Sequence, residues 1–253
     1  MKRAARIIGI LLCSLCFMLV TQNCHSSDSF IAAQTKPTDS QRPPKPTSES
    51  VLFADTFENY VTWKEGSTHG NWFVNFNGGG DVGIESDTTL PGGSKMVHFQ
   101  KPKASTVADE THASLVTSIQ AMGDFNLFIK MKTLQQLRTP TPNPWETAWV
   151  VWHYTDNDHF YYFTLKTNGW EIGKRDPAYT GGQKFLKTGS TPKVIVGSFA
   201  DVNIKQTGAT ITIVVNGSEL ATFADTERPY FTGKLGLYNE DAYVHFDNVK
   251  ATY

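Results

Sequence analysis

Short runs of alternating apolar and polar residues, separated by turn residues, fill the sequence from position 51 to position 253. The clearest example is TITIVV at 210–215, which Asn216-Gly217 separates from SELATF at 218–223. Alternation with a period of two is typical of strands with one buried face, and Asn-Gly is a strong hairpin signal. No stretch keeps the 3.6-residue apolar spacing of a helix for three turns. The pattern therefore predicts an all-β fold of about twelve antiparallel strands in a two-sheet sandwich.

Composition and charge narrow the functions that such a fold could serve. The chain has 253 residues, 40% of them hydrophobic and 19% charged, which is ordinary for a globular protein. Its formal net charge of -1 predicts no nucleic-acid partner, because such proteins carry a basic face. The sequence also lacks the GxSxG, HExxH and P-loop motifs of common enzyme classes.

The N-terminus predicts export. Lys2, Arg3 and Arg6 precede an apolar run at 7–20, which is too short to span a bilayer comfortably and typical of a signal peptide, here residues 1–23. Cys24 follows Thr-Gln-Asn and resembles the lipidated cysteine of a bacterial lipoprotein, although Asn23 replaces the usual small residue. The alternative is cleavage near position 26 or 33 and a freely secreted protein. We expect a lipid anchor at Cys24 and a cell-surface or periplasmic location.

Residues 24–50 predict a tether between this anchor and the folded domain. They include four prolines and almost no apolar residue after Ala33. Such a segment cannot bury enough surface to offset its ordering entropy, and its prolines favour extended polyproline structure. We expect a monomeric domain at 51–253 held away from the membrane.

The segments ETAWVVWHY (146–154) and HFYYFTLK (159–166) predict an aromatic hairpin at the centre of the domain. A loop at 155–158 would pair Tyr154 with His159 and divide the side chains between two faces. One face is almost wholly apolar and is assigned to the core: Ala148, Val150, Trp152, Tyr161, Phe163 and Leu165. The other mixes rings with polar tips and includes Trp149, His153, Tyr162 and Lys166. This second face suits a sugar platform, because sugars stack their C–H faces on rings and need directional hydrogen bonds. The alternative is cross-strand stabilisation without a ligand.

Three segments carry a resemblance to a known superfamily. FADTFENY near position 53, VNGSELATF at 215–223 and HFDNVKATY at 245–253, together with the aromatic hairpin, resemble the concanavalin A-like lectin/glucanase superfamily. The likeness covers residues 51–253 and is strongest to laminin-G-like modules and the 3-keto-disaccharide hydrolase group. It implies a jelly roll whose first and last strands are neighbours, and it fits lectins, glycosidases and lyases alike.

Two kinds of catalysis can be compared with the sequence. The glucanases of the superfamily carry Glu-x-Asp-x-(x)-Glu, but Glu85-Ser86-Asp87 lacks the third carboxylate, so that mechanism cannot be carried over. A polysaccharide lyase would need a cation or amide and a proton acceptor. Residues of those types are Gln136, Arg138, His153, Tyr162 and Lys166.

The sequence thus predicts a tethered carbohydrate-binding domain, with an extracellular glycoside hydrolase or polysaccharide lyase as the alternative and a protein-binding adhesin as a third class. No catalytic residue is assigned. The predicted carbohydrate-binding residues are Arg138, Glu146, Trp149, His153, Tyr162, Lys166, Trp170 and Glu171.

The resemblance also implies a structural calcium ion on the convex side. Its ligands would be Asp247 of the last strand and backbone carbonyls of the N-terminal strand. The alternative is that Asp247 caps a turn or forms a hydrogen bond across the sheet.

Overall fold

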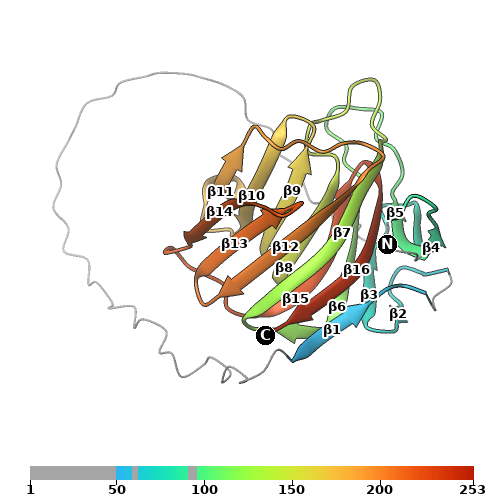
Figure 1. Ribbon diagram of the computed structural model, residues 1–253. Helices are drawn as coiled ribbons and strands as arrows, with labels where there is room; N and C mark the ends of the chain where they lie inside the picture. Colours follow the sequence, from blue (N-terminus) through green and yellow to red (C-terminus); the bar gives the residue numbers. More distant parts are fainter. Residues whose placement is uncertain (1–49, 59–61, 91–95) are drawn as a thin grey trace, which may run out of the picture.

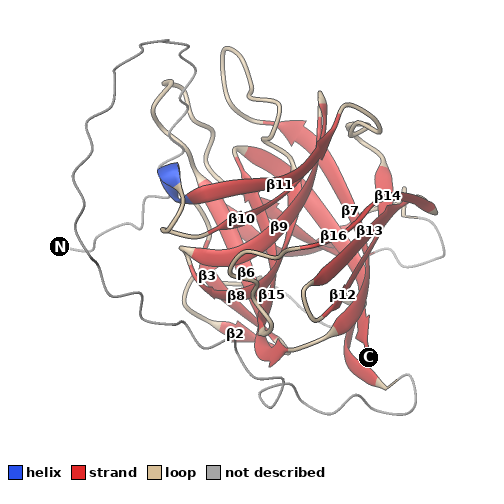
Figure 2. Ribbon diagram, turned by 90° about the vertical axis from the view of Figure 1, so that its left-hand side faces the viewer, coloured by secondary structure: helices blue, strands red, loops and turns tan. Residues whose placement is uncertain are grey.

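The computed structural model describes residues 50–58, 62–90 and 96–253. The predictions of a signal peptide at 1–23, a tether at 24–50 and lipidation at Cys24 lie outside these ranges, apart from residue 50. Among the residues that the structure describes, no helix has the length and apolar character needed to cross a membrane. The regular structure of this part is β-strand, apart from a short 3-10 turn at Thr180–Gly182 (Figure 2).

Two antiparallel sheets pack face to face (Figure 1). In spatial order, sheet A contains β14 (Ser218–Ala224), β13 (Thr210–Val215), β12 (Phe199–Thr207), β7 (Phe125–Gln136), β16 (Ala242–Thr252), β5 (Met96–Lys101) and β4 (Asp81–Ser86), with β1 (Val51–Asp55) also paired to β16. Sheet B contains β11 (Gln183–Gly189), β10 (Gly169–Arg175), β9 (His159–Lys166), β8 (Ala148–Asp156), β15 (Gly233–Glu240), β6 (Ala113–Met122), β3 (Trp72–Phe76) and β2 (Thr68–His69). The predicted all-β, two-sheet jelly roll is confirmed.

The hairpin of β13 and β14 forms where the sequence predicts it. Asn216 and Gly217 at its turn have φ values of 49° and 79°, as a two-residue turn with the favoured twist requires. Along β13, Ile211, Ile213 and Val215 point into the core while the intervening residues face outward. The alternation in the sequence is therefore the alternation of the two faces of the sheet.

The core between the sheets contains the six residues of the aromatic hairpin that the sequence assigned to it. Ala148, Val150, Trp152, Tyr161, Phe163 and Leu165 are all buried in the main hydrophobic cluster. From the opposing sheet, residues of β7, β12, β13 and β16 such as Leu127, Ile204 and Phe246 pack against them. Burial of this apolar surface is the main stabilising contribution to the fold.

The first and last strands of the domain are neighbours, as predicted. β1 pairs with β16 through Phe53↔Ala251 and Asp55↔Val249. β16 also pairs with β7 and β5. The last strand thus lies in the interior of sheet A and holds both the N-terminal strand and the centre of the sheet in place.

Candidate functional site

A second aromatic cluster lies on the side of sheet B that faces away from the core. Trp149, Tyr162 and Tyr238 form its centre, with Leu115, Val151 and Phe160 around them. The Trp149 and Tyr162 ring centroids are 4.9 Å apart, and the Tyr238 ring meets Trp149 edge-on at 5.5 Å. We call this surface the outer face of sheet B. The sequence placed Trp149 and Tyr162 on this side correctly, but it did not include Tyr238.

The rings of the outer face are less accessible than an open sugar platform requires. Trp149 is 7% exposed, Tyr238 4% and Tyr162 0%. The cause is lateral packing, because Phe76 and Trp145 also lie against the cluster, and the Trp149 Nε1 donates to the Trp145 carbonyl at 2.8 Å. The expectation that Trp149 is a freely exposed stacking ring is therefore wrong, and the rings form a closed apolar floor.

A polar network borders this floor on β9 and β10. The Tyr162 hydroxyl donates to Glu171 Oε1 at 2.7 Å, and Lys166 Nζ donates to Glu171 Oε2 at 2.6 Å. Gln183 on β11 in turn donates to the Tyr162 hydroxyl. Gly173 makes this arrangement possible, since a Cβ at that position would lie 2.2 Å from the Tyr162 oxygen. Burial, and then the adjacent Glu171 carboxylate, raise the pKa of Tyr162 well above its usual value, so the hydroxyl stays a donor.

A second carboxyl group lies on the other side of the floor. Glu240, at the end of β15, accepts a hydrogen bond from the Tyr238 hydroxyl at 2.7 Å and is itself partly exposed. Loss of solvation by the surrounding protein raises the pKa of Glu240, and the charges of Asp241 and Glu146 add to that rise. Tyr238 pairs with Trp149 across the strands, so the alternation of Gly236, Tyr238 and Glu240 was the signal that could have placed Glu240 on this face.

His153 is not on the outer face, contrary to the prediction. The register between β8 and β9 shifts between Trp152 and Asp156, and this bulge turns His153 towards the core, where its ring meets Phe125 edge-on. Its nitrogens lie 2.9 and 3.0 Å from the carbonyls of Tyr230 and Gly123. Burial lowers its pKa. His153 has a positive φ of 50°, which an even alternation along the strand does not anticipate.

Trp170 also lies on the core side. It pairs with Leu165 across β10 and β9, is 7% exposed, and belongs to the main hydrophobic cluster. Its Nε1 donates to the Thr191 carbonyl at 2.8 Å, which ties the end of β10 to the loop after β11. Trp170 is therefore not on the predicted sugar-binding face, because the strand alternation that buries Ile172 in the core buries Trp170 there as well.

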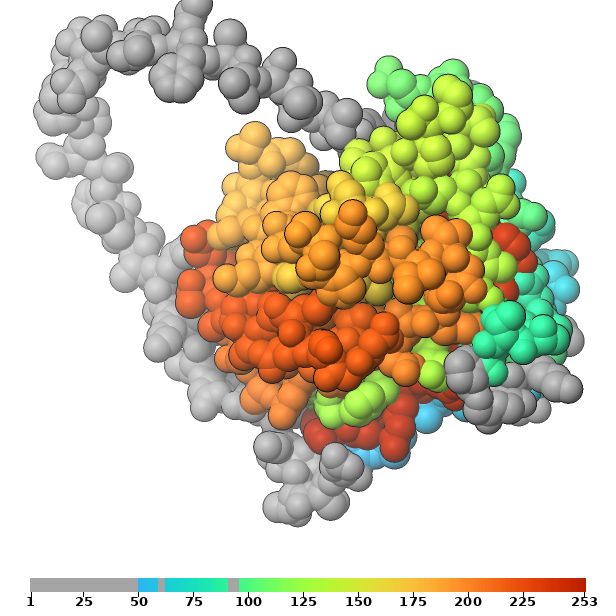
Figure 3. Space-filling view, turned by 45° about the horizontal axis from the view of Figure 1, so that its top comes forward, coloured from blue at the N-terminus to red at the C-terminus, as the bar shows by residue number. Residues whose placement is uncertain are grey.

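Arg138 and Glu146 pair with each other within the loops at one end of the sandwich. The Arg138 Nε donates to Glu146, and its Nη2 donates to Asp241 at 2.9 Å and to the Glu110 carbonyl at 2.7 Å. Burial opposes the charge, but the hydrogen bond and charge of Glu146 outweigh it and raise the pKa of Arg138. The two side chains join the loops at 102–112 and 137–147, which form one lobe in green and yellow-green at the upper right of Figure 3.

The predicted residues thus separate into three groups. Trp149, Tyr162, Lys166 and Glu171 lie together on the outer face of sheet B, Arg138 and Glu146 join two loops beside it, and His153 and Trp170 face the core. Of the five residues considered for a lyase, Tyr162 and Lys166 meet at Glu171, whereas Arg138 lies in a loop and His153 faces the core. Glu85 and Asp87, the glucanase-like pair, lie at β4 in the other sheet and interact with His245.

Asp247, the predicted calcium ligand, lies on β16. It is fully buried, and within the described part of the chain neither carboxylate oxygen accepts a hydrogen bond. Burial raises its pKa to about 7, and the nearby Glu58 and Asp55 add to this. No cluster of three His, Cys, Asp or Glu side chains forms a metal site among the described residues. A calcium ion at Asp247 would therefore depend on backbone carbonyls, which are suitable oxygen ligands.

The sheet order and the pairing of the terminal strands define a concanavalin A-like jelly roll. More specifically, residues 50–252 match the family of the 3-keto-alpha-glucoside-1,2-lyase-like domain. The match spans most of the chain, and the protein belongs to this family. No curated protein sequence matches it.

Solved structures with the same architecture include carbohydrate-active proteins. The carbohydrate-binding module CBM66 from Bacillus subtilis has a TM-score of 0.52 and 13% identity, covering 72% of this chain and 96% of that one. A non-specific endo-β-1,3(4)-glucanase of family GH16 has a TM-score of 0.48 and 10% identity, with 82% and 92% covered. A GH16 protein of Bacteroides ovatus has a TM-score of 0.49 and 9% identity, with 79% and 97% covered. The similarity to the first of these shows a shared fold.

Proposed function

We propose that the outer face of sheet B binds a saccharide. The observation that carries this proposal is the combination, on one face, of a closed aromatic floor with partly exposed polar groups at its borders. Lys166 can donate to sugar hydroxyls, and Glu240 can accept from them. Apolar surface with a few positioned polar groups is the usual composition of a small-molecule site. The family and the likeness to CBM66 support a carbohydrate as the ligand.

The polar groups at the border are held in position before any ligand arrives. Glu171 accepts hydrogen bonds from both Tyr162 and Lys166, and Glu240 accepts one from Tyr238. Side chains that are already ordered lose less entropy on binding. This arrangement favours recognition of a small number of sugar rings by hydrogen bonds over stacking on a broad aromatic surface.

A glycan array probed with the full-length protein tests this proposal. Loss of one hydrogen bond to a charged group costs about 1.5–3 kcal/mol, so Lys166→Gln and Glu240→Gln should each weaken binding about tenfold or more. Lys205→Ala, an exposed residue of β12 on the other sheet, is the matched control. The proposal fails if the protein binds no glycan, or if both outer-face variants bind as tightly as the control.

A second candidate function is elimination on a 3-keto-glucoside, which the family description suggests. The specific observation is Glu240, because a partly exposed carboxyl group with a raised pKa beside the aromatic floor is suited to proton transfer. In such a reaction Glu240 would remove the proton from C2, which the neighbouring ketone makes acidic. The electrons of that C–H bond would form the C1–C2 double bond as the C1–O1 bond breaks, and the leaving oxygen would take up a proton.

The two candidates differ in what Glu240→Gln does. An elimination would release the aglycone from a 3-keto-glucoside and generate an ultraviolet-absorbing enone. We expect Glu240→Gln to abolish this release, while Glu171→Gln changes binding more than turnover. If wild-type protein binds saccharides but leaves a 3-keto-glucoside intact, the binding function stands alone.

We further propose that Asp247 holds a structural calcium ion with backbone carbonyls near β1. The burial of this carboxylate, to which the described residues donate no hydrogen bond, supports the proposal, since an ionised carboxylate in that setting needs a compensating cation. The ion would tie β16 to the N-terminal strand and would take no part in recognition on sheet B.

We also propose that the protein is exported and tethered by a lipid at Cys24. The support is the sequence alone, with its basic start, apolar run and following cysteine. Metabolic labelling with a palmitate analogue in a bacterial host tests it. We expect the wild-type protein to be labelled and the Cys24→Ser variant to remain unlabelled. An unlabelled, freely secreted wild-type protein would contradict the lipid anchor.

A further inference from the structure

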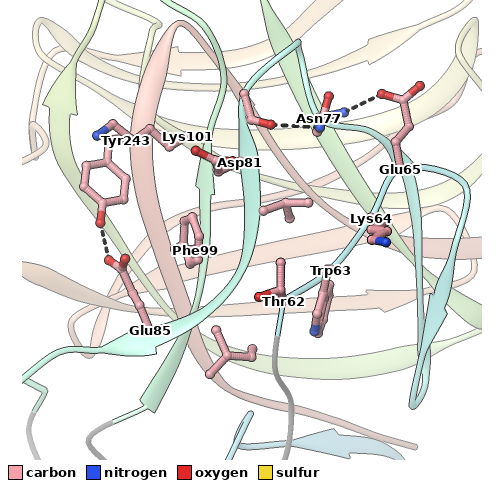
Figure 4. Close-up of a pocket in the computed structure, with 13 residues that line it drawn as sticks. Thr62, Trp63, Lys64, Glu65, Asn77, Asp81, Glu85, Phe99, Lys101 and Tyr243 are labelled. Atoms are coloured by element: carbon pink, nitrogen blue, oxygen red, sulfur yellow. Dashed lines mark hydrogen bonds between the residues drawn. The ribbon is translucent and has the colours of Figure 1, made fainter.

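A groove of about 460 Å³ opens on the other side of the molecule, at the β4–β5 edge of sheet A (Figure 4). Its walls come from β4, β5 and the start of β16 on one side and from the segment at 62–65 on the other. The volume lies within the usual range of about 300–1,000 Å³ for small-molecule sites. No residue of the groove belongs to the outer face of sheet B.

Two partly exposed rings form the floor of the groove. Phe99 and Tyr243 meet edge-on with centroids 6.3 Å apart, and Tyr243 also meets the His245 ring edge-on at 5.4 Å, but both Phe99 and Tyr243 remain partly exposed. Phe99 lies over Gly83, where a Cβ would come within 3.4 Å of the ring. Figure 4 shows Phe99 at the centre of the lining residues. Accessible ring faces of this kind can stack on the C–H faces of a ligand.

A carboxylate with a fixed position lies beside these rings. Glu85 accepts a hydrogen bond from the Tyr243 hydroxyl, and the His245 Nε2 lies 2.5 Å from the same oxygen. The His245 Nδ1 lies 2.7 Å from Asp87, which also accepts a hydrogen bond from Lys132 at 2.6 Å. A buried chain of polar groups therefore orients Glu85 from beneath. Its other oxygen has no hydrogen bond within the described residues, and the side chain is 31% exposed.

The charges around the groove favour a neutral ligand. Lys64 and Lys101 face Glu65, Asp81 and Glu85, so neither sign dominates. Lys101 Nζ lies 4.9 Å from the centre of the Tyr243 ring and has no ion-pair partner in the described part of the chain. Carboxylates that can accept and an ammonium group that can donate, next to exposed rings, match the hydroxyls and C–H faces of an uncharged sugar.

From these observations we propose that the groove is a second saccharide-binding site, specific for neutral oligosaccharides and independent of the outer face of sheet B. In this site Phe99 and Tyr243 stack on a sugar ring, Glu85 accepts from its hydroxyls and Lys101 donates to it. Two sites on opposite sheets allow one domain to contact two chains of a polysaccharide, or two segments of one chain, and to gain avidity from both contacts.

The test is an NMR titration of the full-length protein with a panel of neutral glucose tetrasaccharides that differ in linkage. We expect at least one of them to shift the amide signals of Ile84, Glu85, Phe99 and Tyr243. Phe99→Ala and Lys101→Ala should each weaken this binding about tenfold, which is the upper end of the effect of one stacking or polar contact. Shifts confined to sheet B with every sugar would overturn the second site.

The controls separate this proposal from the one for sheet B. Phe128→Ala on β7 removes a ring that is 46% exposed on the same sheet but outside the groove, and it should leave the binding unchanged. Lys205→Ala is the corresponding control for Lys101. Glu240→Gln should weaken the binding reported by sheet B about tenfold or more and leave the shifts of the groove intact. Groove shifts that appear only with acidic or amino sugars would contradict the assignment to neutral oligosaccharides.

Discussion

The two sheets expose different chemistry on the sides that face away from their common core. On sheet B, the outer face is closed by packed rings, with Trp149 and Tyr162 almost inaccessible. On sheet A, the corresponding side carries ionic groups: the Lys132–Asp87–His245 chain, and the buried carboxylate of Asp247. Packed rings bordered by the Lys166–Glu171 pair therefore dominate one side, and buried ionic groups dominate the other, although both belong to the same sandwich.

Because of this difference, the stability of the two sides should respond differently to pH and salt. Ring packing depends little on pH or salt, whereas buried ion pairs depend on the protonation state of their members. Accessible rings are found beside the ionic chain, in the groove of Phe99 and Tyr243, and not where most aromatic residues gather. A high density of aromatic residues is thus a poor guide to an open binding surface, because rings that meet each other seal each other.

The largest expected effect is on stability and comes from sheet B. Trp149→Ala should cost about 3–5 kcal/mol in the free energy of unfolding, as for a buried core ring. Trp152→Ala, on the core side of the same strand, is the matched control and should cost a similar amount. Chemical denaturation of the two variants measures both. A Trp149 variant that is nearly as stable as wild type would mean that the outer face is open after all.

Breaking the ionic chain of sheet A should be nearly as costly. Lys132→Met leaves Asp87 buried with fewer partners, and such losses cost about 3 kcal/mol or more. Burial opposes the ionisation of Asp87, but hydrogen bonds from Lys132, Thr89 and His245 outweigh it, so its pKa is lowered on folding. This contribution to stability is complete above the unfolded-state pKa of about 3.9 and is lost as the pH falls towards the folded-state value.

A pH series separates the two sides of the molecule. Thermal melts between pH 6 and pH 2 should show a shallower acid-induced loss of stability in Asp87→Asn than in wild type. Trp149→Ala should keep the wild-type slope at a lower overall stability. If the melting temperature falls equally steeply with pH in wild type and Asp87→Asn, the ionic chain of sheet A does not contribute to stability as predicted.

Calcium removal should have a smaller effect that depends on pH. The pKa of Asp247 is raised to about 7 in the folded protein. Without a cation, the free energy of unfolding therefore falls as the pH rises from about 4 through 7, because the carboxyl ionises more easily in the unfolded chain. At pH 8 a bound calcium ion offsets this, so EDTA should lower the melting temperature by a few degrees. At pH 5 the carboxyl is protonated without the metal, and EDTA should change little. Asp247→Asn should be insensitive to EDTA at both values, and an EDTA effect that persists in this variant would place the ion elsewhere.

The smallest effect is expected in the groove. Phe99 is only half-buried, so Phe99→Ala should cost about 1–2 kcal/mol of stability, well below the cost of Trp149→Ala. Differential scanning calorimetry of the two variants compares them directly. If Phe99→Ala is the more damaging change, the contrast between a sealed and an open aromatic surface is wrong.

The strands and the division of the central hairpin into two faces could be predicted from the sequence. Alternation along 148–152 and 161–165 assigned the six apolar core residues of that hairpin correctly, because side chains of a regular strand must alternate, but it failed at His153, where the strand bulges. The pairing of β1 with β16 followed from the resemblance of FADTF and HFDNV to terminal strands.

The accessibility of the site residues could not be predicted in the same way. Alternation gives the side on which Trp149 lies, but its exposure depends on Tyr238 and Trp145, which come from distant or irregular segments. A bulge such as the one at His153 depends on space left by Gly233, where a Cβ would come within 2.3 Å of the His153 carbonyl carbon. The groove requires contacts between 62–65 and β4 that no local pattern contains.

The position of β16 in the interior of sheet A has a consequence for the order of folding. Its partners β1, β5 and β7 come earlier in the chain, and β1 lies almost two hundred residues before it. Until residues 242–252 are available, sheet A has no strand to join these partners, and β7 and β5 expose unpaired edges. We expect the domain to acquire its structure late, after synthesis of the final strand, and slowly, as chains with distant strand pairs do. A nascent chain should therefore leave the earlier strands of sheet A open to chaperones and proteases until residues 242–252 have been synthesised.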